Sequence, residues 1–193
     1  MPASKKPTVR KMAVYAAGIS VFVLASPTPT LFAIGAVLAV IGESWRVWGC
    51  GHLRKNKAVI QSGPYAHVKN PLYLGTFLIM MGAILAASNP TNYSRYLLIV
   101  ALPMFLGVFF VYYLPHKFEV EGDRLRRRFG EEWDHYNKSV PDFVPRVTPF
   151  APSKEKWSRA LVVENSEVSA AILVVLGMLA LGARMAIDIP GLW

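Results

Sequence analysis

The feature that most constrains the fold of this chain is the recurrence of long apolar runs. They occur at about residues 12–26, 31–48, 71–87, 96–114 and 168–187. The last four approach the roughly 20 residues that a helix needs to cross the hydrocarbon of a bilayer. With 53% hydrophobic and only 17% charged residues, the chain is too apolar for an ordinary soluble domain. The runs predict an all-α integral membrane protein with about five transmembrane helices.

The first run, residues 12–26, has two interpretations. It is shorter than the others and follows a basic stretch, so it fits the apolar region of a signal peptide cleaved near Ala25. Alternatively it is a first span. The sequence Pro27-Thr28-Pro29 after it favours a tight turn between two antiparallel spans, because proline presets turn geometry and lacks an amide hydrogen.

The distribution of basic residues predicts the orientation. Of the 21 Lys and Arg residues, 19 lie in the N-terminal tail, in residues 46–69 or in residues 117–159. Five spans place all three segments on one side, which the positive-inside rule makes cytoplasmic. We expect a bacterial inner-membrane protein with a cytoplasmic N-terminus and site. The basic residues flank spans and form no nucleic-acid module, so the expected partners are the membrane and a lipid, with no nucleic acid.

Two polar insertions, residues 49–70 and 115–165, fall on the predicted cytoplasmic side. In the second, five apolar residues recur at helical spacing: Phe118, Leu125, Phe129, Trp133 and Tyr136. This spacing predicts an amphipathic helix along the membrane surface, ended by Pro141 and Pro145. Taken alone, the segment is more typical of a basic interfacial anchor than of part of a site.

Several polar residues in or near the apolar runs are candidates for functional sites. Glu43 and Arg46 lie three residues apart in the second run and predict an ion pair, either structural or functional. His116 with Glu119 is the single suggestive metal pair, and we predict no metal site. Cys50, between two glycines, is predicted to be a packing residue. No phosphate-binding glycine loop or nucleophile elbow is present.

Two motifs give the sequence its specificity. The first runs Gly63-Pro64-Tyr65 and then Lys69-Asn70-Pro71-Leu72-Tyr73-Leu74-Gly75, and the second comprises Glu121, Leu125, Phe129-Gly130, Trp133, Tyr136, Val140-Pro141 and Pro145. In this order, separated by one helical hairpin, they resemble the isoprenylcysteine carboxyl methyltransferase and phospholipid methyltransferase superfamily. The resemblance covers residues 43–146 of a single domain spanning 1–193, to which the run at 168–187 is additional.

The resemblance implies a multi-span methyltransferase that uses S-adenosylmethionine. Its implied cofactor-binding residues are Gly63, Pro64, Tyr65, His67, Lys69, Asn70, Tyr73, Glu121 and Tyr136. Glu121 would accept hydrogen bonds from the cofactor's ammonium or ribose, and Lys69 and Asn70 would donate to its carboxylate. The candidate catalytic residues are Tyr73, Arg146, His67 and Arg46. An arginine would hold a carboxylate acceptor, and His67 or His116 would take a proton from an amine or thiol.

Three positions depart from the superfamily pattern. Lys69-Asn70 stands where Arg-His is common, Gly122 where a second glutamate is expected, and Asp142 where an arginine closes the motif. We therefore expect a methyl acceptor that is lipid-linked or small and apolar, resembling a prenylcysteine carboxylate or a phospholipid amine, without choosing between them. Two alternatives stay open: an NADPH-dependent membrane reductase on a related scaffold, and a non-catalytic membrane scaffold protein.

Overall fold

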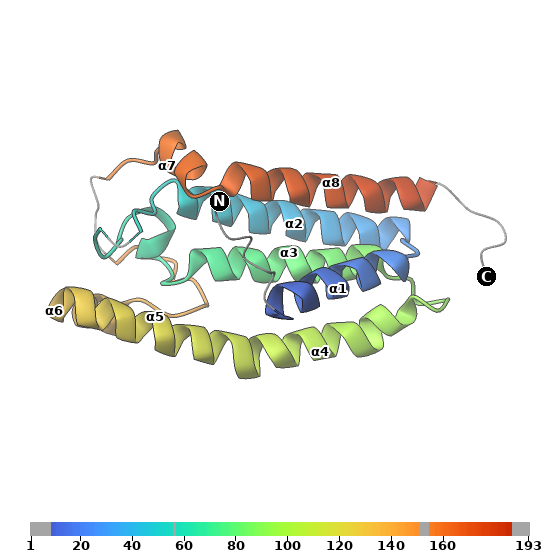
Figure 1. The fold of residues 1–193 in the computed structure, drawn as a ribbon. Helices are drawn as coiled ribbons and strands as arrows, with labels where there is room; N and C mark the ends of the chain where they lie inside the picture. The colour runs from blue at the N-terminus through green and yellow to red at the C-terminus, as the bar shows by residue number, and fades with distance from the viewer. Residues whose placement is uncertain (1–8, 56, 151–154, 187–193) are drawn as a thin grey trace, which may run out of the picture.

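The computed structural model describes residues 9–55, 57–150 and 155–186, and in these ranges it contains helices and no strands (Figure 1). The predicted all-α class is confirmed. Lys5, Lys6 and residue 187 of the last predicted span lie outside the described residues. The α-helices are α1 (Val9–Val23), α2 (Pro29–Cys50), α3 (Pro71–Ala87), α4 (Leu102–Gly107), α5 (Leu114–Phe129), α6 (Glu131–Ser139), α7 (Arg159–Glu164) and α8 (Glu167–Ala186). One 3₁₀ turn, η1 (Gly63–Ala66), and two π-helical stretches, η2 (Leu97–Ala101) and η3 (Val108–Tyr113), complete the described elements.

Three of the described helices are long and apolar enough to cross a membrane. They are α2 with 22 residues, the continuous helix Leu97–Phe129 with 33, and α8 with 20. Helix α3 is apolar but has 17 residues, and α1 has 15. Every predicted apolar run therefore contains a helix, whereas the predicted number of five spans is not confirmed by helix length.

Glycines let α2 and α3 approach backbone to backbone. A Cβ on Gly42 would lie 2.6 Å from the carbonyl oxygen of Gly75, and one on Gly75 would lie 2.5 Å from that of Gly42. Seven residues away on each helix, a Cβ on Gly82 would lie 2.5 Å from the carbonyl oxygen of Gly35. Small residues are the usual means of close helix packing in a membrane, where apolar side chains gain little by leaving lipid. These four glycines fix the spacing of the α2–α3 pair.

The long helix Leu97–Phe129 packs on α3 through aromatic rings. The Phe77 ring of α3 lies 5.7 Å from that of Phe105 and 5.0 Å from that of Phe109, measured between centroids. Phe110 and Phe143 complete the group, at 5.2 and 5.5 Å from Phe77. Phe109 and Phe110 belong to the π-helical stretch η3. This contact therefore depends on ring stacking and not on backbone approach.

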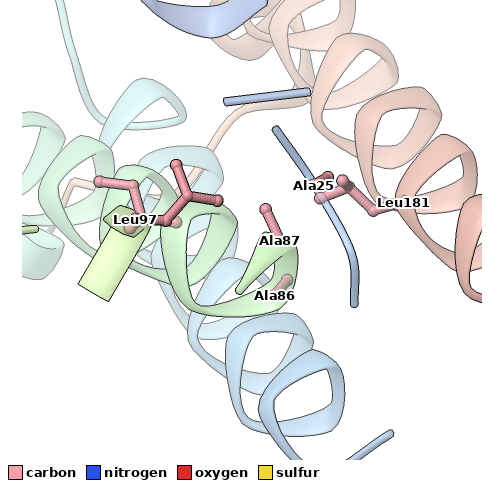
Figure 2. Close-up of a cluster of buried hydrophobic side chains, with 6 residues drawn as sticks. Ala25, Ala86, Ala87, Leu97 and Leu181 are labelled. Atoms are coloured by element: carbon pink, nitrogen blue, oxygen red, sulfur yellow. The ribbon is translucent and has the colours of Figure 1, made fainter. Parts of the chain in front are cut away.

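A small hydrophobic cluster closes one end of the bundle. Figure 2 shows Ala25, Ala86, Ala87, Leu97 and Leu181 converging from different segments. Ile84 belongs to the same buried cluster. The amide of Ser26 donates to the carbonyl oxygen of Ala87 at 3.0 Å, which ties the turn between α1 and α2 to the end of α3. The described turns at this end are thereby held together.

Helix α8 is attached to α2 by a bidentate ion pair. The Arg46 Nε and Nη2 atoms donate to the two carboxylate oxygens of Glu167 at 2.6 and 2.7 Å, and Nη1 donates to the Thr76 hydroxyl at 2.6 Å. The Glu167 side chain is only 3% exposed. The predicted ion pair between Glu43 and Arg46 is therefore wrong. The actual partner of Arg46 is Glu167, which lies 121 residues further along the chain and could not be identified from local spacing.

Cys50, at the last residue of α2, is buried, and its Sγ donates to a Glu167 oxygen at 3.3 Å. It packs as predicted and also contacts the Arg46–Glu167 pair.

The long helix extends beyond what a bilayer core requires. Thirty-three residues at 1.5 Å each give a length of about 50 Å, against a hydrocarbon thickness of about 30 Å. Gly130, at φ 54°, ends it and separates α5 from α6. The predicted amphipathic helix thus forms as two helices, the second ending at Ser139 before Pro141. Its placement along the membrane surface stays a prediction.

Candidate active site

A cavity of about 430 Å³ lies at the end of the bundle where α3 begins and α5 ends. Its volume is within the roughly 300–1,000 Å³ typical of small-molecule sites. The first motif contributes Tyr65, Lys69, Asn70, Pro71, Leu72 and Tyr73 to its walls, and the second contributes Glu121, Gly122, Leu125, Trp133 and Tyr136. Two segments far apart in the sequence, with 48 residues between Tyr73 and Glu121, therefore line one cavity. Figure 1 shows the arrangement of the helices α3 and α5 that carry them.

A hydrogen bond joins the two motifs directly. The Tyr73 hydroxyl on α3 donates to the Glu121 Oε1 atom on α5 at 2.6 Å. The Tyr73 ring also meets Tyr113 edge to face, with centroids 5.8 Å apart. A carboxylate has about four acceptor positions, so Glu121 keeps capacity for a ligand after receiving this hydroxyl.

A second hydrogen bond positions the turn that carries Tyr65. The Tyr136 hydroxyl on α6 donates to the Tyr65 carbonyl oxygen at 2.7 Å, and Tyr136 is 2% exposed. Burial raises the pKa of both phenols, chiefly because the charged form would lose its hydration. Both hydroxyl groups therefore remain protonated, and Tyr136 remains a donor.

Glycine is required at position 63 of the first motif for two reasons, its backbone conformation and the space available beside it. Gly63 has φ 57°, and a Cβ there would overlap the His52 ring. The His52 Nδ1 atom and the Ser62 Oγ atom are 3.0 Å apart, and the Ser62 hydroxyl donates to Glu155 at 3.1 Å. Burial lowers the pKa of His52, so its imidazole is neutral near pH 7.

Lys69, Asn70 and Asp142 form one group of contacts at the cavity wall. The Lys69 Nζ atom lies 2.8 Å from the Asp142 carboxylate and donates to the Asn137 side-chain oxygen at 2.6 Å. The Asn70 amide donates to the Asp142 carbonyl oxygen at 3.1 Å. Two positions that depart from the superfamily pattern thus contact each other. The Lys69 charge, 6% exposed, is compensated within the protein.

Several predicted site residues do not line the cavity. His67 and Arg146 lie together, with the His67 Nδ1 atom 2.9 Å from the Arg146 carbonyl oxygen, and the Arg146 guanidinium donates to the Ser139 carbonyl oxygen at 3.0 Å. Arg46 is held by Glu167 on α8. Of the residues predicted to bind the cofactor, six line the cavity: Tyr65, Lys69, Asn70, Tyr73, Glu121 and Tyr136. Gly63, Pro64 and His67 support the turn behind it.

Other lining residues were not singled out from the sequence. Lys55 and Arg124 supply positive charge, and Asn137 holds Lys69. Lys55 and Arg124 each belong to a basic stretch that we interpreted only as an orientation signal, so nothing local distinguished them. In the described ranges, no three His, Cys, Asp or Glu side chains gather closely enough to hold a metal ion.

The comparison with protein families agrees with this arrangement. The model of the phospholipid methyltransferase family matches residues 15–132, which contain the first motif and the Glu121 half of the second. The chain belongs to this family. As a phospholipid methyltransferase family member, it carries the family region from α1 to the start of α6, and the helices α7 and α8 lie outside the match.

Two curated relatives carry other names. The nickel-cobalt-cadmium resistance protein NccN of Alcaligenes xylosoxydans xylosoxydans is 28% identical over 122 residues, which is 63% of this chain and 51% of that protein. The cobalt-zinc-cadmium resistance protein CzcN of Cupriavidus metallidurans is 29% identical over 120 residues, covering 62% and 50%. This family member thus spans about half the length of the curated relatives it matches. No solved structure matches it.

Proposed function

We propose that the protein is an S-adenosylmethionine-dependent methyltransferase that modifies a lipid-linked or small apolar acceptor at the cytoplasmic face of the membrane. Membership of the phospholipid methyltransferase family supports methyl transfer in general. The observation that carries the proposal is the Tyr73–Glu121 hydrogen bond, because it joins the two motifs across a cavity of ligand size.

The cavity walls fit the chemical groups of this cofactor. Glu121 offers carboxylate oxygens to an ammonium or to ribose hydroxyls, and Tyr65, Tyr73 and Trp133 offer flat apolar surfaces for an adenine. Helix α3 begins at Pro71, which also lines the cavity. The free backbone amides and the dipole at this end of the helix favour binding of a carboxylate.

The proposed reaction requires no covalent intermediate with a side chain of the protein. S-adenosylmethionine supplies a methyl group already activated by a sulfonium. The protein must align donor and acceptor and exclude water, and such positioning contributes on the order of 7–11 kcal/mol in favourable cases. An apolar acceptor would lie on the membrane side, against the rings of Tyr73 and Tyr113. The water-soluble cofactor would lie on the aqueous side, against the charged wall of the cavity.

Cofactor binding tests the proposal. Purified protein in detergent is titrated with S-adenosylmethionine in a calorimeter. Glu121→Gln, which removes the carboxylate charge, and Tyr73→Phe, which breaks the hydrogen bond between the motifs, should each weaken binding about tenfold, or about 1.4 kcal/mol. Glu119→Gln is the matched control, since Glu119 lies on the same helix and does not line the cavity.

Three outcomes would contradict the proposal. Absence of binding by the unaltered protein at millimolar cofactor would remove the cofactor assignment, and displacement by a nicotinamide dinucleotide would favour the reductase alternative. Binding without transfer of labelled methyl to total-lipid or prenylpeptide extracts would favour the scaffold alternative.

A further inference from the structure

The cavity lining carries an excess of positive charge. Four basic side chains line it, those of Arg54, Lys55, Lys69 and Arg124, against the two carboxylates of Glu121 and Asp142. Two of the basic groups have partners: Arg54 lies 3.7 Å from Glu155, and Lys69 lies 2.8 Å from Asp142.

The other two cations are uncompensated. Among the described residues, neither the Lys55 ammonium nor the Arg124 guanidinium makes a hydrogen bond or an ion pair. Both side chains line the cavity and are exposed to solvent. Arg124 follows Glu121, the acceptor of the Tyr73 hydroxyl, by three residues on α5. Two positive charges therefore line the cavity without a protein partner among the described residues.

Gly122 leaves part of the cavity wall without a side chain. A Cβ at Gly122 would find its nearest neighbour, the Trp133 ring, at 4.0 Å, which is ordinary contact. Packing therefore does not require glycine here, and a glycine inside a helix costs about 1 kcal/mol relative to alanine. The superfamily pattern has a glutamate at this position. Its absence removes one negative charge from a wall that also holds Arg124.

We infer that Lys55 and Arg124 bind an oxyanion, a carboxylate or a phosphate, carried by a ligand of this cavity, and that Gly122 makes room for it. A guanidinium presents paired donors that match the oxygens of either group. The identity of that ligand rests on the proposed function. The oxyanion belongs either to the amino-acid part of the cofactor or to an anionic acceptor. Lys69, predicted earlier for the cofactor carboxylate, is already paired with Asp142.

Inorganic phosphate tests the site without any cofactor. The intact protein in detergent is treated with phenylglyoxal, and modification of Arg124 and Arg128 is followed by peptide mass spectrometry. Phosphate should slow modification of Arg124 severalfold and leave Arg128 unchanged, because Arg128 lies on the same helix outside the cavity. Gly122→Glu should abolish the protection, whereas Gly122→Gln, similar in size but neutral, should retain part of it.

Two further measurements identify the source of the oxyanion. If it is the cofactor carboxylate, the unaltered protein should bind S-adenosylmethionine at least tenfold more tightly than its decarboxylated analogue, and Arg124→Gln or Lys55→Gln should erase that preference. If it belongs to the acceptor, both variants should bind each of the two cofactors as tightly as the unaltered protein does, and their KM for methyl transfer to anionic lipid should rise about tenfold. Lys57→Gln serves as the control for Lys55.

The inference is overturned if phosphate leaves Arg124 unprotected and all three variants, Arg124→Gln, Lys55→Gln and Gly122→Glu, match the unaltered protein. Phosphate protection in a protein that binds no S-adenosylmethionine would instead uphold the oxyanion site and reject the proposed function.

Discussion

At the scale of single residues, two tyrosine hydroxyl groups hold the two motifs in register. Tyr136 donates to the main chain of Tyr65, and Tyr73 donates to Glu121, so each motif supplies one donor and one acceptor. The Tyr136 hydrogen bond is buried, and a hydrogen bond shielded from water is electrostatically stronger than one in water.

We predict that Tyr136→Phe destabilises the protein by about 1–3 kcal/mol, because the buried Tyr65 carbonyl oxygen loses its donor. Thermal unfolding in detergent measures the effect. Tyr112→Phe is the control, since Tyr112 is 69% exposed. Equal midpoints for both variants would show that the Tyr136 hydrogen bond contributes little.

The sequence anticipated these residues better than their partners. Tyr65, Tyr73, Glu121 and Tyr136 could be assigned to one pocket because the order of the two motifs carries that information. The pairing of Lys69 with Asp142 could not be anticipated, because it depends on how the loop after α6 folds back.

At the scale of elements, glycine spacing decides which helices pair most closely. Gly35 and Gly42 on α2 face Gly82 and Gly75 on α3, so the two backbones meet without side chains between them. Sequence periodicity located both helices but gave no sign of this pairing. The seven-residue spacing becomes meaningful only when both helices are seen together.

We predict that Gly42→Val strongly reduces the yield of folded protein, because the Cβ alone would lie 2.6 Å from the Gly75 carbonyl oxygen of α3. Size-exclusion chromatography and thermal unfolding in detergent measure folding. Gly107→Ala is the matched control: it lies in a helix, has nothing within 4 Å of an added Cβ, and should be neutral or mildly stabilising. Similar behaviour of both variants would contradict the role given to the α2–α3 contact.

At the scale of the whole molecule, the two ends of the bundle differ in chemistry. One end carries the cavity with its charged residues, and the other carries the small hydrophobic cluster of Figure 2. Apolar runs predicted the positions of the helices well because hydrophobicity dominates in a membrane. They could not establish the number of spans, because α1 and α3, with 15 and 17 residues, are shorter than the roughly 20 residues that cross the hydrocarbon of a bilayer.

We predict that the end carrying the cavity faces the cytoplasm. In a Cys50→Ser background, Lys138→Cys should react with a membrane-impermeant maleimide only after the inner membrane is opened. Thr91→Cys, on the turn after α3, should react once the outer membrane alone is permeable. The reverse pattern would invert the orientation, and reaction of both cysteines from one side would show that α3 and the long helix do not both cross.

Helix α3 makes different contacts on its two sides. It meets α2 through glycine backbones, whereas it meets the long helix through aromatic rings. Glu121 belongs to the long helix and Tyr73 to α3. If the proposed acceptor enters from the bilayer between these two helices, we expect it to displace the long helix and to stretch the Tyr73–Glu121 hydrogen bond. The length of that bond would then report whether the entrance is closed.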